Sequence, residues 1–245
     1  MSRPKSLASL APGLLALALL AGPVPAAAPA LAAEATTATP APAPAAPEAG
    51  MLLFEQHQLG GTKPGETLLY RYHLKVSDPE LGQSFDDTIR LTVAASAPGE
   101  DKDARDLAVN FFSGERHRAA GPFEGVTGNP ILILMLENHV RELSDKLKGN
   151  PRYFKNAIRV AMRDKAQVTP AKITLDGRTY DGWRVEITPF KGDSNAKRMR
   201  GLDGLTYDFL VSPDLPGEVA SITITADAPG GRLFEEALTY DPKGS

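Results

Sequence analysis

Apolar residues recur with the spacing of an α-helix along one stretch, residues 128–165. Side chains three and four positions apart share one face of a helix, so this spacing predicts an amphipathic helix. In the first half of the stretch the apolar positions are Leu132, Leu136, Val140, Leu143 and Leu147. In the second half they are Phe154, Ala157, Ile158, Ala161 and Met162. The pattern therefore predicts two helices joined by a short turn.

The same tripeptide precedes each predicted helix, as Gly128-Asn129-Pro130 and Gly149-Asn150-Pro151. An Asn side chain accepts hydrogen bonds from the free N–H groups of a first helical turn, and Pro loses nothing at the next position. Gly149 is also expected to take the left-handed conformation that closes the preceding helix.

On both sides of this stretch the apolar positions alternate with polar ones, which is typical of half-buried strands. Strands are predicted within residues 68–76, 85–93, 107–114, 173–175, 183–187, 205–211, 220–226 and 233–240. Short loops join the first three, which makes them an antiparallel meander. Asp176-Gly177 and Asp181-Gly182 are both hairpin-turn signals. Residues 51–54 fit either a first strand or a covering helical turn.

Strands with one apolar and one polar face must bury the apolar face against another element, and amphipathic helices need a surface on which to bury their apolar side. The sequence therefore predicts an α+β fold, with a curved antiparallel sheet of about eight strands. This incomplete barrel would be covered by the two-helix insertion.

The run from Ile131 to Leu136 is apolar on every side of its helix, so something must cover it. It could plug into the protein's own sheet, or part of it could line a cavity for an apolar ligand. The run is too short to span a bilayer.

The N-terminus has the layout of a secretory signal peptide, with Arg3 and Lys5 before an apolar core over residues 7–21. We expect cleavage after Ala32, an Ala/Pro/Thr-rich disordered tether over residues 33–50, and a single globular domain over residues 51–245. The mature protein would be periplasmic or secreted, with no transmembrane segment. Because the chain contains no cysteine, thiol chemistry and the usual lipoprotein anchor are excluded.

The formal net charge is −3, and loss of Arg3 and Lys5 with the signal peptide would leave −5. An acidic balance of this kind gives no overall attraction for nucleic acid.

The order of elements resembles that of periplasmic lipoprotein-carrier proteins of the LolA and LolB type. The resemblance lies in a signal peptide, a tether, a three-strand meander, a Leu- and Met-rich helical segment from Ile131 to Met162, and a closing run of strands. It implies an apolar cavity between sheet and helices that holds acyl chains. The family's motifs are not matched, so no functional residue is carried over, and the LolB branch has a lipid-bearing cysteine that this chain lacks.

No catalytic residues, metal site or cofactor are predicted, so we expect a non-enzymatic protein. His139 and Glu142, three apart on the first helix, are expected to form a solvated or capped pair rather than a metal site. Ser194 follows Gly192-Asp193 in a turn and lacks the setting of a serine nucleophile. The adjacent carboxylates Glu235 and Glu236 would face opposite sides of a strand.

Two functions remain open. In the first, an apolar or amphipathic, lipid-like ligand binds between sheet and helices. Its lining would be Leu132, Met135, Leu136, Phe154, Ile158 and Met162. An anionic headgroup would meet the basic loop residues Lys191, Lys197, Arg198 and Arg200, unless that loop is merely solvated. In the second, the protein is a cell-envelope interaction module whose helices fill the sheet and leave no cavity.

Overall fold

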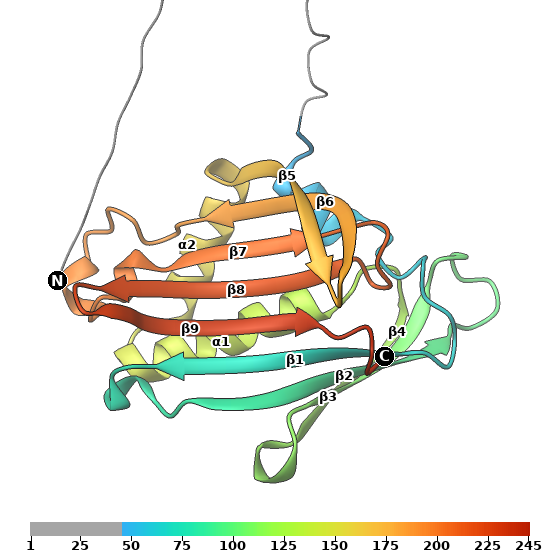
Figure 1. The fold of residues 1–245 in the computed structure, drawn as a ribbon, viewed down its shortest axis with the longest axis horizontal. Coiled ribbons are helices and arrows are strands. Elements are labelled where there is room, and N and C mark those ends of the chain that lie inside the picture. Colours follow the sequence, from blue (N-terminus) through green and yellow to red (C-terminus); the bar gives the residue numbers. More distant parts are fainter. Residues whose placement is uncertain (1–45) are drawn as a thin grey trace, which may run out of the picture. The chain divides into compact units, whose positions relative to one another are not determined.

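The computed structural model describes residues 46–245, and within them the chain forms one nine-stranded antiparallel sheet with two α-helices (Figure 1). The strands are β1 (Thr67–Val76), β2 (Phe85–Ala95), β3 (Arg105–Phe111), β4 (Arg118–Val126), β5 (Gln167–Leu175), β6 (Arg178–Ile187), β7 (Thr206–Val211), β8 (Val219–Ala228) and β9 (Gly231–Tyr240). The helices are α1 (Ile131–Leu147) and α2 (Pro151–Asp164). The predicted α+β class is confirmed. The expected signal peptide and residues 33–45 of the expected tether lie outside the described residues.

The first and last strands pair at the centre of the sheet. The strand order is β4-β3-β2-β1-β9-β8-β7-β6-β5, and in the central pair Tyr72 stands opposite Leu238. Every other neighbouring pair is consecutive in the chain, so β4 and β5 are the two edges. The α1–α2 segment connects these edges and lies behind the strands in Figure 1. Both helices therefore cover the same face of the sheet.

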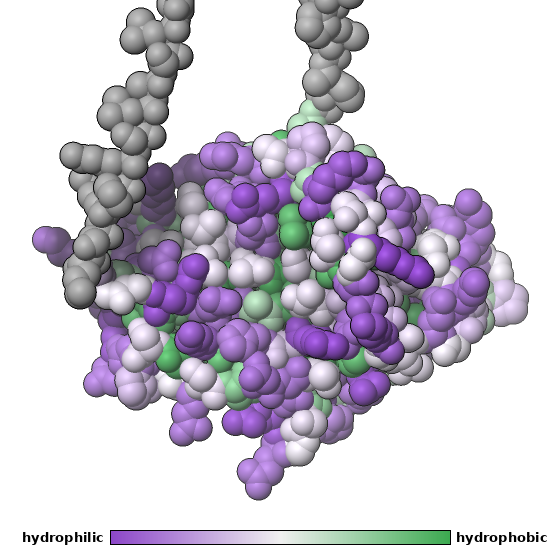
Figure 2. Space-filling view, viewed as in Figure 1, coloured by the Kyte–Doolittle hydropathy of each residue, from purple (hydrophilic) through white to green (hydrophobic). Residues whose placement is uncertain are grey.

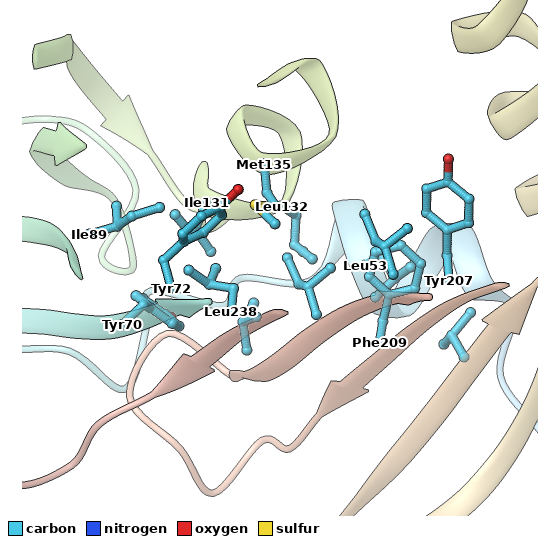
Figure 3. Close-up of a cluster of buried hydrophobic side chains, with 14 of the residues drawn as sticks. Leu53, Tyr70, Tyr72, Ile89, Ile131, Leu132, Met135, Tyr207, Phe209 and Leu238 are labelled. Atoms are coloured by element: carbon cyan, nitrogen blue, oxygen red, sulfur yellow. The ribbon is translucent and has the colours of Figure 1, made fainter. Parts of the chain in front are cut away.

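The helix-facing side of the sheet and one side of α1 form the core. Ile131, Leu132 and Met135 are completely buried and point from α1 toward the side chains of the sheet (Figure 3). Tyr70 and Tyr207, from strands in the two halves of the sheet, are also completely buried. The sheet thus covers the inner side of the apolar run from Ile131 to Leu136. The side of this run that faces away from the sheet is partly open to solvent, since Ile133 is 54% exposed.

Strand β4 is the element that the sequence did not predict. Its residues contain Gly121, Pro122 and Gly125 and show no apolar alternation. Its pairing with β3 shifts register twice, and every residue in it is at least partly exposed. A strand of this kind is held by its backbone pairing to β3 and leaves no period-two pattern to detect. The predicted third strand, within residues 107–114, also extends three residues too far. The observed β3 ends at Phe111, and the chain then turns into β4.

One further detail differs from the sequence expectation, and one alternative that the sequence left open is decided. Only Asp176-Gly177 makes a hairpin turn, with both residues at positive φ, whereas Asp181 and Gly182 lie inside β6 opposite Lys172 and Ala171. The segment Met51–Glu55 is a single turn of π-helix, which settles the choice between strand and helical turn.

The two Gly-Asn-Pro tripeptides both start helices, but their Asn residues differ in burial. Asn150 Oδ1 accepts from the Arg152 N–H at 2.9 Å at an exposed position. Asn129 Oδ1 accepts from the Ile131 N–H at 3.1 Å, and its buried Nδ2 donates to the Tyr70 hydroxyl (3.0 Å) and the Gly217 carbonyl (2.9 Å). Asn129 therefore ties the start of α1 to β1 and to the β7–β8 loop.

Gly149 does not take the left-handed conformation expected at the end of α1. Lys148 does so instead, with φ of 51°. A Cβ on Gly149 would lie 2.6 Å from Cε2 of Phe154, so glycine is needed here to admit the Phe154 ring.

Replacing each Asn separately tests this difference in role. Asn129→Ala removes three hydrogen bonds and strands buried polar groups, so we expect it to lower the free energy of unfolding by about 3 kcal/mol. Asn150→Ala removes one exposed cap and should cost about 1 kcal/mol. Urea denaturation of both variants measures the two values. Equal losses would show that Asn129 is only a helix cap.

Gly182 tests the assignment of Asp181-Gly182 to the interior of β6. A Cβ at this position would lie 2.2 Å from the Val211 carbonyl oxygen of the neighbouring strand. Gly182→Ala should therefore cost about 3 kcal/mol through overpacking, as measured by thermal unfolding. Gly204→Ala is the matched control, because a Cβ at Gly204 meets nothing within 4 Å. A mild effect at Gly182 would place this residue in a turn after all.

Candidate functional site

A groove of about 850 Å³ opens between α1, α2 and the chain segment 46–55. Its apolar lining includes Phe54, Ile133, Leu136, Val140, Ile158 and Met162. Its charged lining consists of Glu48, Glu55, Glu137, Lys155, Arg159 and Arg163. Volumes of 300–1,000 Å³ with a mostly apolar lining are typical of small-molecule sites.

The periodicity of the two helices positions this lining. Ile133, Leu136 and Val140 are three and four residues apart, so they form a stripe on α1 beside the stripe that faces the sheet. On α2, Ile158 and Met162 are one turn apart and present their edges to the groove while remaining less than 10% exposed. The groove is thus lined by residues of both helices that lie next to their core-facing sides.

The third wall is the segment that precedes β1. Leu53 is 1% exposed and anchors the π-helical turn in the core. The buried Gln58 side chain donates to the Leu52 carbonyl at 3.2 Å and accepts from the Asn129 N–H at 2.8 Å, which fixes the turn against the start of α1. This arrangement leaves Phe54 39% exposed at the groove.

The cations of the groove all come from α2. Lys155 pairs with Glu137 across the helices, and Arg163 pairs with its neighbour Asp164 at 2.6 Å. Arg159 has no carboxylate within 4.0 Å among residues 46–245. Arg159 is therefore the cation at the groove that is available to an anionic group.

The six residues predicted to line a ligand space fall into two groups. Leu136, Ile158 and Met162 line the groove. Leu132 and Met135 are 0% exposed in the sheet–helix core, and Phe154 is 3% exposed against Phe190, with 5.9 Å between ring centroids. At these three positions the space between sheet and helices is filled by the protein's own side chains.

None of the four predicted headgroup residues lines the groove. Arg200 is bound to the acids of another loop, 2.8 Å from Asp78 and 2.5 Å from Glu80. Lys191, Lys197 and Arg198 are exposed. The loop that carries them packs on the first turn of α2, because the ring of Phe190 contacts those of Tyr153 and Phe154. From the sequence, Arg152 and Lys155 are possible extensions of a basic rim, but Arg159 and Arg163 are expected only to point away from the core, because the pattern does not show which apolar residues lie beside them.

His139 is the centre of a buried polar network, contrary to the expectation of a solvated pair with Glu142. Its Nδ1 lies 2.5 Å from Glu236 Oε2 on β9, and its Nε2 lies 3.0 Å from the Tyr207 hydroxyl on β7. The Tyr72 hydroxyl donates to Glu236 Oε1 at 2.8 Å. All four side chains are at most 3% exposed. Of the predicted pair, only Glu142 is in contact with solvent, with 43% of its side chain exposed. Glu235 and Glu236 face opposite sides of β9, as expected.

Every polar atom of this network has a partner. Burial and the neighbouring Glu236 carboxylate raise the pKa of the Tyr72 and Tyr207 hydroxyls well above the usual value, so both remain protonated donors. With Tyr207 donating to Nε2, the Nδ1–H donates to Glu236 and all donors are used. None of the four residues lines the groove. The network therefore positions α1 on the sheet and is not exposed to a ligand there.

One cluster among residues 46–245 has the composition of a metal site. His57, Asp101 and Asp103 bring their ligand atoms within 4.8 Å of one another, and His57 Nδ1 lies 3.2 Å from Asp103 Oδ2. Imidazole and carboxylate are ligands for divalent cations. No local sequence pattern indicates this cluster, because more than 40 residues separate His57 from the two acids.

Comparisons with known proteins do not identify a family. No protein-family model matches the chain, and no curated protein matches its sequence. A search of solved structures finds the crystal structure of LprF from Mycobacterium bovis at 12% identity, covering 81% of this chain and 94% of that one. The TM-score is 0.28, which is too low to support any conclusion about this protein. The resemblance to lipoprotein carriers therefore stays a prediction. No helix among the described residues has the length and hydropathy needed to cross a membrane.

The burial of the His139 network leads to a testable contrast with a second His–carboxylate pair. His73 Nδ1 also lies 2.5 Å from a carboxylate oxygen, on Asp86, but the two side chains are 43% and 81% exposed. His139→Leu leaves a buried carboxylate without its main partner and should cost about 4 kcal/mol. His73→Leu should cost less than about 1 kcal/mol. Chemical denaturation at neutral pH measures both, and similar values would contradict the structural role of His139.

Proposed function

We propose that this protein binds an amphipathic ligand, an acyl chain with an anionic headgroup, in the groove between α1, α2 and residues 46–55. The observation that carries the proposal is the exposure of Ile133 (54%) and Phe54 (39%) at a concave site beside Arg159, which pairs with no carboxylate within residues 46–245. The acyl chain would cover the apolar lining, and Arg159 would receive the headgroup. No enzymatic activity is part of this proposal.

The location differs from the one that the sequence suggested. A ligand between sheet and helices would have to displace Leu132 and Met135, which are fully buried, and closely packed cores resist such changes. The groove requires no such displacement. Covering an exposed Ile or Phe releases ordered water and contributes roughly 25 cal/mol per Å² of apolar surface. The apolar contacts provide affinity, and Arg159 provides a preference for an anion through charge-assisted hydrogen bonds.

The packed sheet–helix interface favours a second candidate. A domain whose helices fill its own sheet fits an interaction module of the cell envelope, with the groove residues as its contact surface. Both candidates include export of the chain, which we propose from the sequence of residues 1–32. Native mass spectrometry of the purified domain, followed by organic extraction, separates the two candidates. Co-purifying lipid supports the ligand-binding function, and a protein that stays bare and binds no acyl probe supports the module.

A polar substitution at the groove tests the proposal in solution. Ile133→Asn places an amide in the acyl site, and we expect it to weaken binding of a dansyl-labelled fatty acid about tenfold, which corresponds to about 1.4 kcal/mol. Because Ile133 is exposed, the variant should keep the stability of the parent protein. Met51→Gln is the matched control, since Met51 is 43% exposed but does not line the groove. Equal probe affinity in both variants would refute the groove as the binding site.

A further inference from the structure

The exposed side of α2 carries a continuous row of cations. Arg152, Lys155, Arg159 and Arg163 are three, four and four residues apart and all exposed. Residues at these spacings lie on one face of a helix. The adjacent face holds the buried Phe154, Ile158 and Met162. Helix α2 is thus a basic amphipathic helix whose apolar side is already used by the core.

This row is an exception in an acidic chain. Residues 151–165 contain five cations and one acid, Asp164, a net charge of +4, while the whole chain has a formal net charge of −3. Two members of the row have acidic partners, Lys155 with Glu137 and Arg163 with Asp164. Arg152 and Arg159 have no carboxylate within 4.0 Å in the described part of the chain. The positive charge is therefore concentrated along α2 itself, while Glu48, Glu55 and Glu137 at the adjoining groove offset part of it.

The face of the sheet that the helices leave open has a different character. Figure 2 shows this face as largely hydrophilic, with apolar residues scattered among polar ones. Two of its arginines are held by acids: Arg184 bonds to Asp208 at 2.6 Å, and Arg71 bonds to Asp241 at 2.8 Å. Cations and acids are thus mixed on the open face, whereas residues 151–165 of the α2 side carry a net charge of +4.

Apolar residues stand beside the α2 cations. Ile133 and Phe54 are exposed at the groove that Lys155, Arg159 and Arg163 also line. A surface that binds only a soluble polyanion needs cations alone. A surface that binds a membrane interface uses cations for the phosphates and exposed apolar side chains for the boundary between headgroups and acyl chains. The combination on this face fits the second case.

We propose that the α2 face docks on the surface of an anionic phospholipid membrane. The cations Arg152, Lys155, Arg159 and Arg163 contact lipid phosphates, and Ile133 and Phe54 enter the headgroup region. This docking does not require a ligand in the groove, so it goes beyond the proposed function. If both hold, the groove opens onto the bilayer from which its ligand is taken.

Vesicle co-sedimentation tests the docking with the chain from Ala33 to Ser245, which lacks the apolar residues 7–21 that would bind any membrane. We expect binding to vesicles of equal parts phosphatidylcholine and phosphatidylglycerol, little binding to phosphatidylcholine alone, and loss of binding at high salt. Arg152→Gln with Arg159→Gln should weaken binding about 30-fold, because each cation near an anionic surface contributes about 1 kcal/mol. Ile133→Asn should weaken it further, since it removes an inserted side chain.

The matched control is Lys75→Gln with Arg90→Gln, which makes the same charge change on the open face of the sheet. Both residues are exposed and alternate with buried Leu74, Ile89 and Leu91. The control should bind vesicles like the parent protein. Absence of vesicle binding by the parent, or equal losses in both double variants, would overturn the docking. Polyphosphate binding as tight as vesicle binding, with no effect of Ile133→Asn, would also overturn it in favour of a soluble polyanion. The fatty-acid assay contains no membrane, so docking and ligand binding succeed or fail separately.

Discussion

The burial of one side of α1 against the sheet is the interaction on which the other features depend. It closes the core with Leu132 and Met135, and it places His139 within reach of Glu236 and Tyr207. It also directs Ile133, Leu136 and Val140 away from the sheet and toward α2. Because a helix has only one side to offer the sheet, the residues left over on α1 become the floor of the groove. Core and groove are two consequences of the same orientation.

Much of this architecture could be predicted from periodicity. Both helices and all strands except β4 left a pattern of apolar residues, because each buries one side and exposes the other. Strand β4 left none, since it is an edge strand with Gly121, Pro122 and Gly125 and no buried residue. The second Asp-Gly pair shows the opposite error. Gly182 looks like a turn residue but is required inside β6 by the close approach of the Val211 carbonyl.

The site was harder to predict for a physical reason. Periodicity identifies which residues are apolar, but not which of two partners covers each of them. Leu132 and Leu136 are indistinguishable in sequence, yet one is buried by the sheet and the other lines the groove. The partner of His139 is 97 residues away, so no local pattern could indicate it. The cations of α2 gain meaning only when the neighbouring exposed residues Phe54 and Ile133 are placed beside them.

The central pairing of β1 with β9 has a consequence for how the molecule forms. Strand β1 cannot gain its second neighbour until the last ten residues of the sheet are available, and contacts so distant in sequence raise the contact order and slow folding. With no cysteine, no disulfide can trap a partial structure on the way. The two halves of the sheet can therefore pair with each other only once the C-terminal strand is available. If the chain is exported, as we propose, slow formation of this central pairing favours an unfolded chain that can pass through a translocation pore.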